Sequence, residues 1–155
     1  MTAARAKRSD IELLAELAAL HALADESDPC WSSDDYWLRT AEPYLALADL
    51  VATRKLHPAI RLLLDRACYG DPGEIMRGLR HNLEAIANPD WWFLAEECLQ
   101  AAQSPRLGTR LWAIDELSIL EDPRARPIFE MAIENGPEDI RWTAQLGLER
   151  LSNKH

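Results

Sequence analysis

The stretch of sequence that decides the fold is DPRARPIFEMAIENGPEDIRWTAQLGLERL, residues 122–151. An Asp-Pro pair opens it, an apolar helical pattern follows, and an Asn-Gly-Pro turn separates that pattern from a second one. Similar openings occur at His57-Pro58 and Asn88-Pro89, so the three openings are spaced by 31 and 34 residues. A period of this length is typical of stacked helix pairs, because one pair cannot bury its apolar face alone.

Helical patterns cover most of the chain and leave little room for strands. They span residues 9–24, 34–55, 58–69, 74–87, 89–103, 105–120, 123–134 and 137–151. No window alternates between apolar and polar residues with the Val, Ile and Thr that strands favour, and Val51 is the single valine. The sequence therefore predicts an all-α protein.

Two details of the N-terminal helices can be predicted. Ser9, followed three residues later by Glu12, predicts a capping box at the start of the first helix. The buried face of that helix is predicted to include Ile11 and His21. Pro43 lies inside the next helical pattern, and since proline lacks a backbone donor we expect two helices to meet there.

The length of 155 residues fits one domain that buries a core of its own. We expect a single domain over residues 1–155, with N-terminal helices in 9–55 and three helix pairs in 56–152.

Two of the second helices share an Arg-x-x-Ala element, at Arg110 to Ala113 and at Arg141 to Ala144. Together with the Asp-Pro opening at Asp122, this pattern resembles HEAT repeats over residues 56–151. The resemblance implies an α-solenoid of antiparallel helix pairs. Because the HEAT pattern is degenerate, it specifies a fold and not an activity.

The charge of the chain bears on its partners. Asp and Glu number 26 against 17 Lys and Arg, which gives a formal net charge of -9. This charge disfavours nucleic acid, because duplex binders draw much of their affinity from neutralising phosphates. The same field would attract a basic protein. The alternative is that the acidic surface only keeps the protein soluble.

No recognisable catalytic or metal-binding motif is present. The three cysteines, an odd number, never form C-x-x-C, which disfavours a disulfide framework and a zinc site. The four histidines are scattered, without H-E-x-x-H, and G-x-S-x-G is absent. We therefore expect no catalytic residue, no metal and no cofactor. The chain also lacks a run of about 18 apolar residues, so we expect no membrane segment and a cytoplasmic location.

The six tryptophans offer the best route from the fold to a site, because interface anchors are enriched in tryptophan. Trp91 and Trp92 share helical stripes with apolar residues and are predicted to lie in the core. Trp142 falls about 160° from the predicted buried stripe of its helix, and Trp112 lies on the flank of its own helix. Since corresponding helices of a repeat array line one surface, we expect Trp112 and Trp142 to stand side by side.

Carboxylates are predicted to ring these two tryptophans. They are Glu84, Asp115, Glu116, Glu138 and Glu149. Such a surface suits a basic partner, whose arginines would stack on the indoles and pair with the carboxylates. The alternative is a solvated acidic helix face that carries two amphipathic tryptophans.

The acidic loop from Asp25 to Asp35 is a second candidate surface, because it places Trp31 among five carboxylates. It is not an EF-hand loop, since Cys30 stands where that loop needs glycine and Tyr36 where it needs glutamate. A flexible connector and a docking arm for a basic protein are the two interpretations.

The size, acidity and helical repeats of the chain also resemble the small all-α immunity proteins of bacterial polymorphic toxin and contact-dependent growth inhibition systems. That resemblance implies a monomer that binds a basic toxin domain, such as a nuclease, in a 1:1 complex and occludes it. Many HEAT proteins are scaffolds or assembly factors, which is the alternative. Trp112, Asp115, Glu116 and Trp142 also resemble in type the residues with which HEAT-like DNA glycosylases hold a cationic base, although this chain lacks the basic groove of those enzymes.

Overall fold

The computed structural model describes residues 8–24, 28–68 and 74–154, apart from the side chains of 31–32 and 74–77. Its α-helices are α2 (Asp10–Ala19), α3 (Asp34–Tyr36), α4 (Glu42–Thr53), α5 (Ala59–Arg66), α6 (Glu74–Ala87), α7 (Trp91–Ala101), α8 (Leu107–Leu120), α9 (Arg126–Asn135) and α10 (Glu138–Asn153). Short 3-10 turns at Pro29–Ser32 and Pro123–Ala125 and a π-helical turn at Trp37–Ala41 complete it. This part of the chain contains no strand, which confirms the all-α prediction for it.

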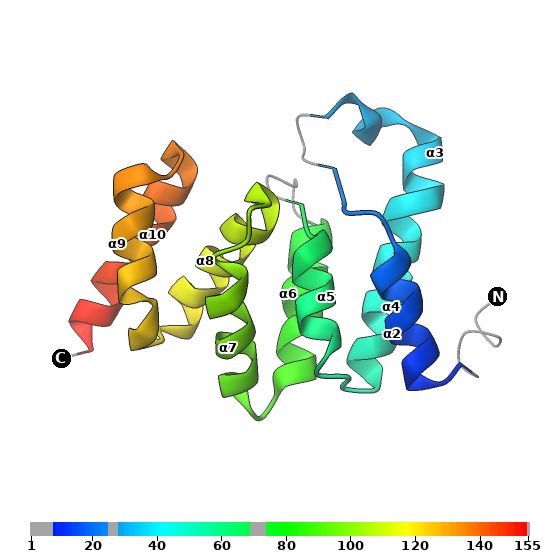
Figure 1. The fold of residues 1–155 in the computed structure, drawn as a ribbon, viewed down its shortest axis with the longest axis horizontal. Coiled ribbons are helices and arrows are strands. Elements are labelled where there is room, and N and C mark those ends of the chain that lie inside the picture. The colour runs from blue at the N-terminus through cyan, green and yellow to red at the C-terminus, as the bar shows by residue number, and fades with distance from the viewer. Residues whose placement is uncertain (1–7, 25–27, 69–73, 155) are drawn as a thin grey trace.

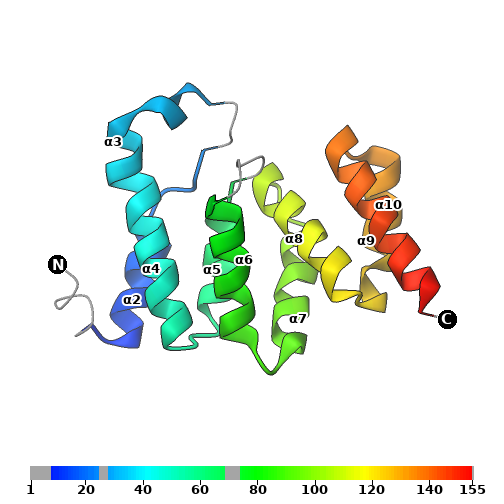
Figure 2. The same cartoon turned by 180° about the vertical axis from the view of Figure 1, so that it is seen from behind.

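The helices form two layers (Figures 1 and 2). α2, α5, α7 and α9 lie on the side facing the viewer in Figure 1, and α4, α6, α8 and α10 face the viewer in Figure 2. Across the layers, α7 packs on α8 and α9 packs on α10; within the second layer, α4 packs on α6 and α8 on α10. Each layer therefore presents a row of helices to solvent.

The first described helix begins as predicted and ends early. The capping box is confirmed, because the Glu12 amide donates to Ser9 Oγ at 3.2 Å and the Ser9 amide donates to the Glu12 carboxylate at 3.1 Å. The helix ends at Ala19 instead of Ala24, since Leu20 is extended. The guanidinium of Arg66 in α5 donates to the carbonyls of Ala18 and Leu20. These hydrogen bonds stabilise the extended chain that follows Ala19.

Two residues predicted to face the core from this helix are exposed. Ile11 is 80 % exposed and His21 lies beyond the helix on the surface, whereas Leu13 and Leu17 are buried. The buried stripe is thus narrower than the sequence pattern, because α4 and α5 cover only one side of the helix.

Pro43 does not divide two helices. The chain stays helical from α3 through the π-helical turn into α4, and the Glu42 amide donates to the Trp37 carbonyl, five residues back. In a π-helical turn each hydrogen bond spans five residues instead of four. This wider turn lets the helix continue past Pro43, which has no backbone N–H to donate. The prediction of a break there was wrong.

None of the helices that the structure describes combines the length and the apolar character needed to cross a bilayer.

Candidate functional site

An arginine of α6 joins two carboxylates of α8. Arg80 donates from Nε to Glu116 Oε2 at 3.1 Å and from Nη2 to Asp115 Oδ2. Glu84, one turn along α6, lies near enough to raise the pKa of Glu116. The structure therefore brings together Glu84, Asp115 and Glu116, three of the predicted carboxylates, around an arginine that the sequence analysis did not include.

Glu116 is a buried carboxyl group rather than part of an exposed rim. Its side chain is 0 % exposed, and its Oε1 has no hydrogen-bond partner among the described residues. Burial raises the pKa of Glu116 to about 7; Arg80 acts in the opposite direction, while the charges of Glu84 and Asp115 add to the rise. Near neutral pH this group is therefore part acid and part carboxylate, and it is not available to pair with a partner at the surface.

Trp112 is also buried, contrary to the prediction. It is 1 % exposed, its indole N–H donates to the carbonyl of Cys68, and the Arg80 guanidinium lies 5.9 Å from its ring centroid. Cys68, which follows α5, and Arg80 of α6 contact the flank of α8 that was predicted to be free. Trp112 is consequently a core residue beneath the Arg80 cluster (Arg80, Glu84, Asp115 and Glu116) and does not stand beside Trp142 on a surface.

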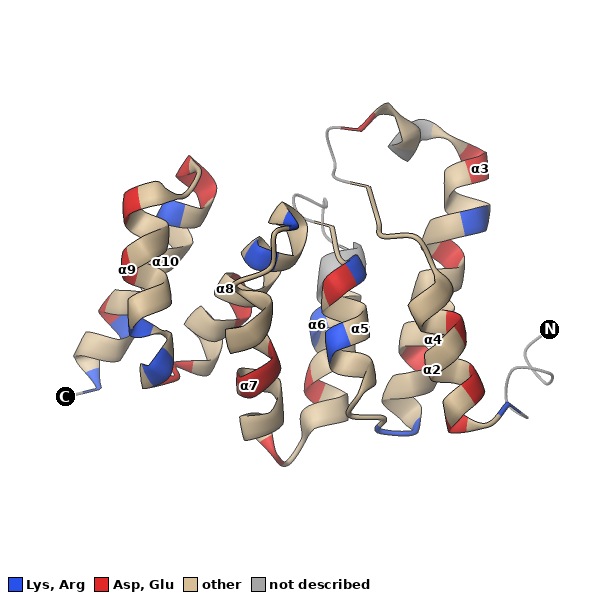
Figure 3. Ribbon diagram, viewed as in Figure 1, with Lys and Arg blue, Asp and Glu red and all other residues tan. Residues whose placement is uncertain are grey.

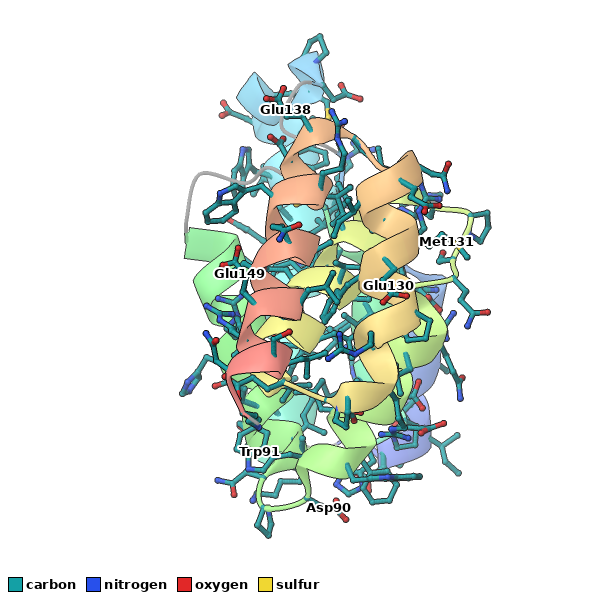
Figure 4. All side chains as sticks on the ribbon, turned by 90° about the vertical axis from the view of Figure 1, so that its left-hand side faces the viewer. Asp90, Trp91, Glu130, Met131, Glu138 and Glu149 are labelled. Atoms are coloured by element: carbon teal, nitrogen blue, oxygen red, sulfur yellow. The ribbon has the colours of Figure 1, made fainter. Side chains whose placement is uncertain are left out.

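Trp142 is exposed as predicted, at 70 %. It shares one stripe of α10 with Glu138 and Glu149, at i−4 and i+7, opposite the stripe that buries Ile140 and Ala144. Figure 4 shows Glu138 near the start of α10 and Glu149 on its side away from α9. The aromatic and acidic elements of the predicted surface therefore meet on α10, which we call the α10 face (Glu138, Trp142 and Glu149).

The second predicted surface, around Trp31, is only partly visible. The side chain of Trp31 lies outside the described residues, as do residues 25–27 of that loop. The Asp28 carboxylate accepts the Cys30 amide at 2.9 Å and opens the 3-10 turn.

Three consecutive aromatic residues at the start of α7 form a surface that the sequence analysis missed. Trp91, Trp92 and Phe93 are 44 %, 57 % and 40 % exposed, so the prediction that both tryptophans lie in the core was wrong. Trp91 has the helical spacing that places it on the same face of α7 as the buried Leu94. It lies, however, in the first turn of α7, at the edge of the molecule, where Figure 4 shows it beside Asp90.

Neighbouring side chains support this α7 aromatic patch (Trp91, Trp92 and Phe93). The His57 ring lies 4.5 Å from that of Phe93, and the Arg124 guanidinium lies 5.4 Å from the ring of Trp92. A signal was present in the sequence: successive helical residues are 100° apart, so three adjacent aromatic residues cannot all face one core.

The residue set that resembles a glycosylase site is not assembled. Trp112 and Glu116 are buried and Asp115 is bound to Arg80, while Trp142 projects from the exposed side of α10. Within residues 8–24, 28–68 and 74–154, no three His, Cys, Asp or Glu side chains gather so that they could hold a metal ion.

Comparison with known proteins gives no relative. No family model matches the chain, and neither the search of curated proteins nor that of solved structures found a match.

Proposed function

We propose that this chain is a HEAT-like helical repeat protein that binds a basic protein through its α10 face. The observation that carries the proposal is Trp142, a tryptophan 70 % exposed between two carboxylates and opposite the buried stripe of its helix. Exposed tryptophans of this kind act as interface anchors, because the ring buries a large area at little cost in side-chain entropy.

The arrangement of the helices supports the repeat architecture. α4, α6, α8 and α10 follow one another along one layer in Figure 2, and the Asp-Pro and Asn-Pro openings fall between α8 and α9 and between α6 and α7. In an α-solenoid each helix pair packs on its neighbours, and a row of corresponding helices forms an extended binding surface.

The charge of the molecule supports a basic partner. Glu138 and Glu149 flank Trp142, and the whole chain carries a formal net charge of -9. Arginines of a basic partner can stack on the indole and pair with these carboxylates, while the net field accelerates the encounter.

Within this class, we propose that the protein is an immunity protein that neutralises a toxin domain by stoichiometric occlusion. A nuclease is a fitting target, since enzymes that bind polyanions carry the basic surface that an acidic inhibitor complements. The size and acidity of the chain and its all-helical fold support this proposal. A scaffold or assembly factor that uses the same face is the alternative, and the activity of the bound partner separates the two.

The experiment compares tryptophan variants of the protein in their binding to the partner that copurifies with it. Trp142→Ala should raise the dissociation rate at least tenfold, because removal of an interface anchor acts mainly on that rate. Trp92→Ala is the matched control, an exposed tryptophan outside the α10 face. An unchanged rate for Trp142→Ala together with a faster one for Trp92→Ala would assign binding to the α7 aromatic patch.

A further inference from the structure

A groove of about 720 Å³ lies between α8 and the α9–α10 pair. Its lining includes none of the residues of the α10 face, so it is separate from the proposed protein-binding function. The volume falls within the range of small-molecule sites, which are mostly apolar with a few polar groups that fix orientation.

One wall of the groove is a regular stripe of α8. Leu107, Arg110, Leu111 and Ile114 line it at positions i, i+3, i+4 and i+7, which places them on one face of the helix. Leu111 and Ile114 are 4 % exposed and form the floor, whereas Leu107 is 41 % exposed at the rim.

The other wall is a stripe of α9 with the same spacing, made of Ile128, Met131, Ala132 and Asn135. Met131 is 66 % exposed, and Figure 4 shows it on the side of α9 away from α10. α9 packs on α10 and makes at most marginal contact with α7 and α8. The two stripes therefore face the same groove without packing against each other. The large apolar side chains of Leu107 and Met131 stay exposed to solvent.

Among the described residues that line the groove, Arg110 is the only charged one. Its Nη1 donates to the carbonyls of Ser104 and Pro105 at 3.1 and 3.3 Å, and these two residues are also part of the lining. No described carboxylate pairs with it, and neither its Nε nor its Nη2 makes a hydrogen bond within the described part of the chain. The backbone thus anchors one nitrogen, while the Nε–Nη2 edge, which can bind a carboxylate in bidentate geometry, has no partner among the described residues.

We propose that this groove binds an aliphatic carboxylate, with its carboxylate on Nε and Nη2 of Arg110 and its chain between the α8 and α9 stripes. A cation that is anchored but unpaired, in a chain of net charge -9, selects an anion at this one place. Each methylene of the ligand that is buried against Leu111, Ile114 and Ala132 adds hydrophobic stabilisation. The volume suits a small ligand better than a partner helix, which is why a free aliphatic acid is the occupant.

The test is titration of the protein with decanoate by isothermal titration calorimetry, with decanol and decyltrimethylammonium as neutral and cationic probes of equal chain length. Decanoate should bind at least tenfold more tightly than either probe. Arg110→Gln should weaken decanoate at least tenfold and leave decanol unchanged, because decanol makes no ion pair with Arg110. Arg141→Gln, an exposed arginine of α10 outside the lining, is the matched control and should bind like the wild type.

Met131→Asp gives a second, independent variant, since an exposed rim residue can change without disturbing the core. It should weaken decanoate by charge repulsion while the far-UV circular dichroism spectrum stays unchanged. The proposal is overturned if decanoate gives no binding at 1 mM, if decanol binds within twofold of decanoate, or if Arg110→Gln and Arg141→Gln behave alike. An apolar peptide with a free C-terminal carboxylate that binds more tightly than decanoate would also overturn it, in favour of a peptide ligand.

Discussion

Two tryptophans on neighbouring helices of one layer have opposite environments. Trp112 is 1 % exposed and bonds to the carbonyl of Cys68, whereas Trp142 is 70 % exposed on α10. Their local sequences are similar, Arg-Leu-Trp-Ala and Arg-Trp-Thr-Ala, so the difference arises from the neighbours. Cys68 and Arg80 contact the Trp112 ring, while the exposed side of α10 is covered by no described helix.

This difference predicts opposite effects of the same substitution on stability. Trp112→Ala should lower the free energy of unfolding by about 3–5 kcal/mol, because it opens a cavity and leaves the Cys68 carbonyl without the indole donor. Trp142→Ala should change it by less than about 0.5 kcal/mol. Urea unfolding of both variants measures the two values, and equal losses would contradict the assigned burial.

Glu116 predicts a specific dependence of stability on pH. Its pKa rises from about 4.5 to about 7 on folding, so between these pH values the native state keeps a proton that the unfolded state has lost. This contribution to stability is complete below about pH 4.5 and is lost as pH rises to about 7, by on the order of 2–3 kcal/mol.

Glu116→Gln removes that titration and provides the reference. The free energy of unfolding of the wild type, minus that of Glu116→Gln, should fall as pH rises from 5 to 8, because the other carboxylates are common to both proteins and cancel. Urea unfolding at the two pH values gives the difference. A difference that is flat or rises with pH would show that Glu116 is ionised in the native protein at both.

At the scale of the elements, the contact between α9 and α10 depends on a glycine. A Cβ atom at Gly147 would lie 2.6 Å from Phe129 Cζ, so the helix is close to the aromatic ring because this position has no side chain. Gly147→Ala should destabilise the protein by about 1–3 kcal/mol, since overpacking outweighs the gain of roughly 1 kcal/mol in helix propensity.

A double-mutant cycle isolates this contact. Phe129→Leu shortens the side chain that the new methyl group would meet, so Gly147→Ala should cost less in the Phe129→Leu background than in the wild type. Thermal or urea unfolding of the four proteins gives the coupling energy. Equal costs in both backgrounds would rule out Phe129 as the source of the strain.

Elements whose limits depend on local chemistry could be predicted from the sequence, and those that depend on distant neighbours could not. The capping box at Ser9 and the limits of α6 follow from capping and turn residues and are confirmed. The early end of α2 depends on Arg66, which is 46 residues away from Leu20 in sequence, and no periodic pattern encodes that contact.

The same limit applies to the candidate site. Helical periodicity placed Trp142 correctly, because α10 has one covered side and one open side. It misplaced Trp112, whose indole is bound by the distant Cys68 carbonyl, and Trp91, which lies at the edge of the molecule. The Arg80 cluster joins residues 35 and 36 positions apart, so the helical pattern predicted the carboxylates but not the arginine that binds them.

At the scale of the whole molecule, the proposal of a basic partner predicts that charge governs the association rate. Acidic residues are distributed over several helices in Figure 3, and the formal net charge is -9. Glu138→Lys combined with Glu149→Lys should lower the association rate about tenfold at low salt and flatten its dependence on salt concentration, because the favourable field at the α10 face is lost.

A matched charge reversal distinguishes this local effect from net charge. Glu42→Lys combined with Glu134→Lys changes the net charge equally at exposed positions on α4 and α9, outside the α10 face. It should lower the association rate less than the α10 pair does. Equal effects, measured by stopped-flow or surface plasmon resonance, would assign the rate to net charge alone.

The most direct test of the central claim is purification of the tagged protein from its native host in about 150 mM salt, a concentration that screens weak surface attraction. We predict a basic toxin domain bound in a 1:1 ratio, whose activity is absent in the complex and returns when Trp142→Ala replaces the wild type. A bound partner that is not basic, that stays active in the complex, or that Trp142→Ala retains and inhibits as well as the wild type would contradict the claim.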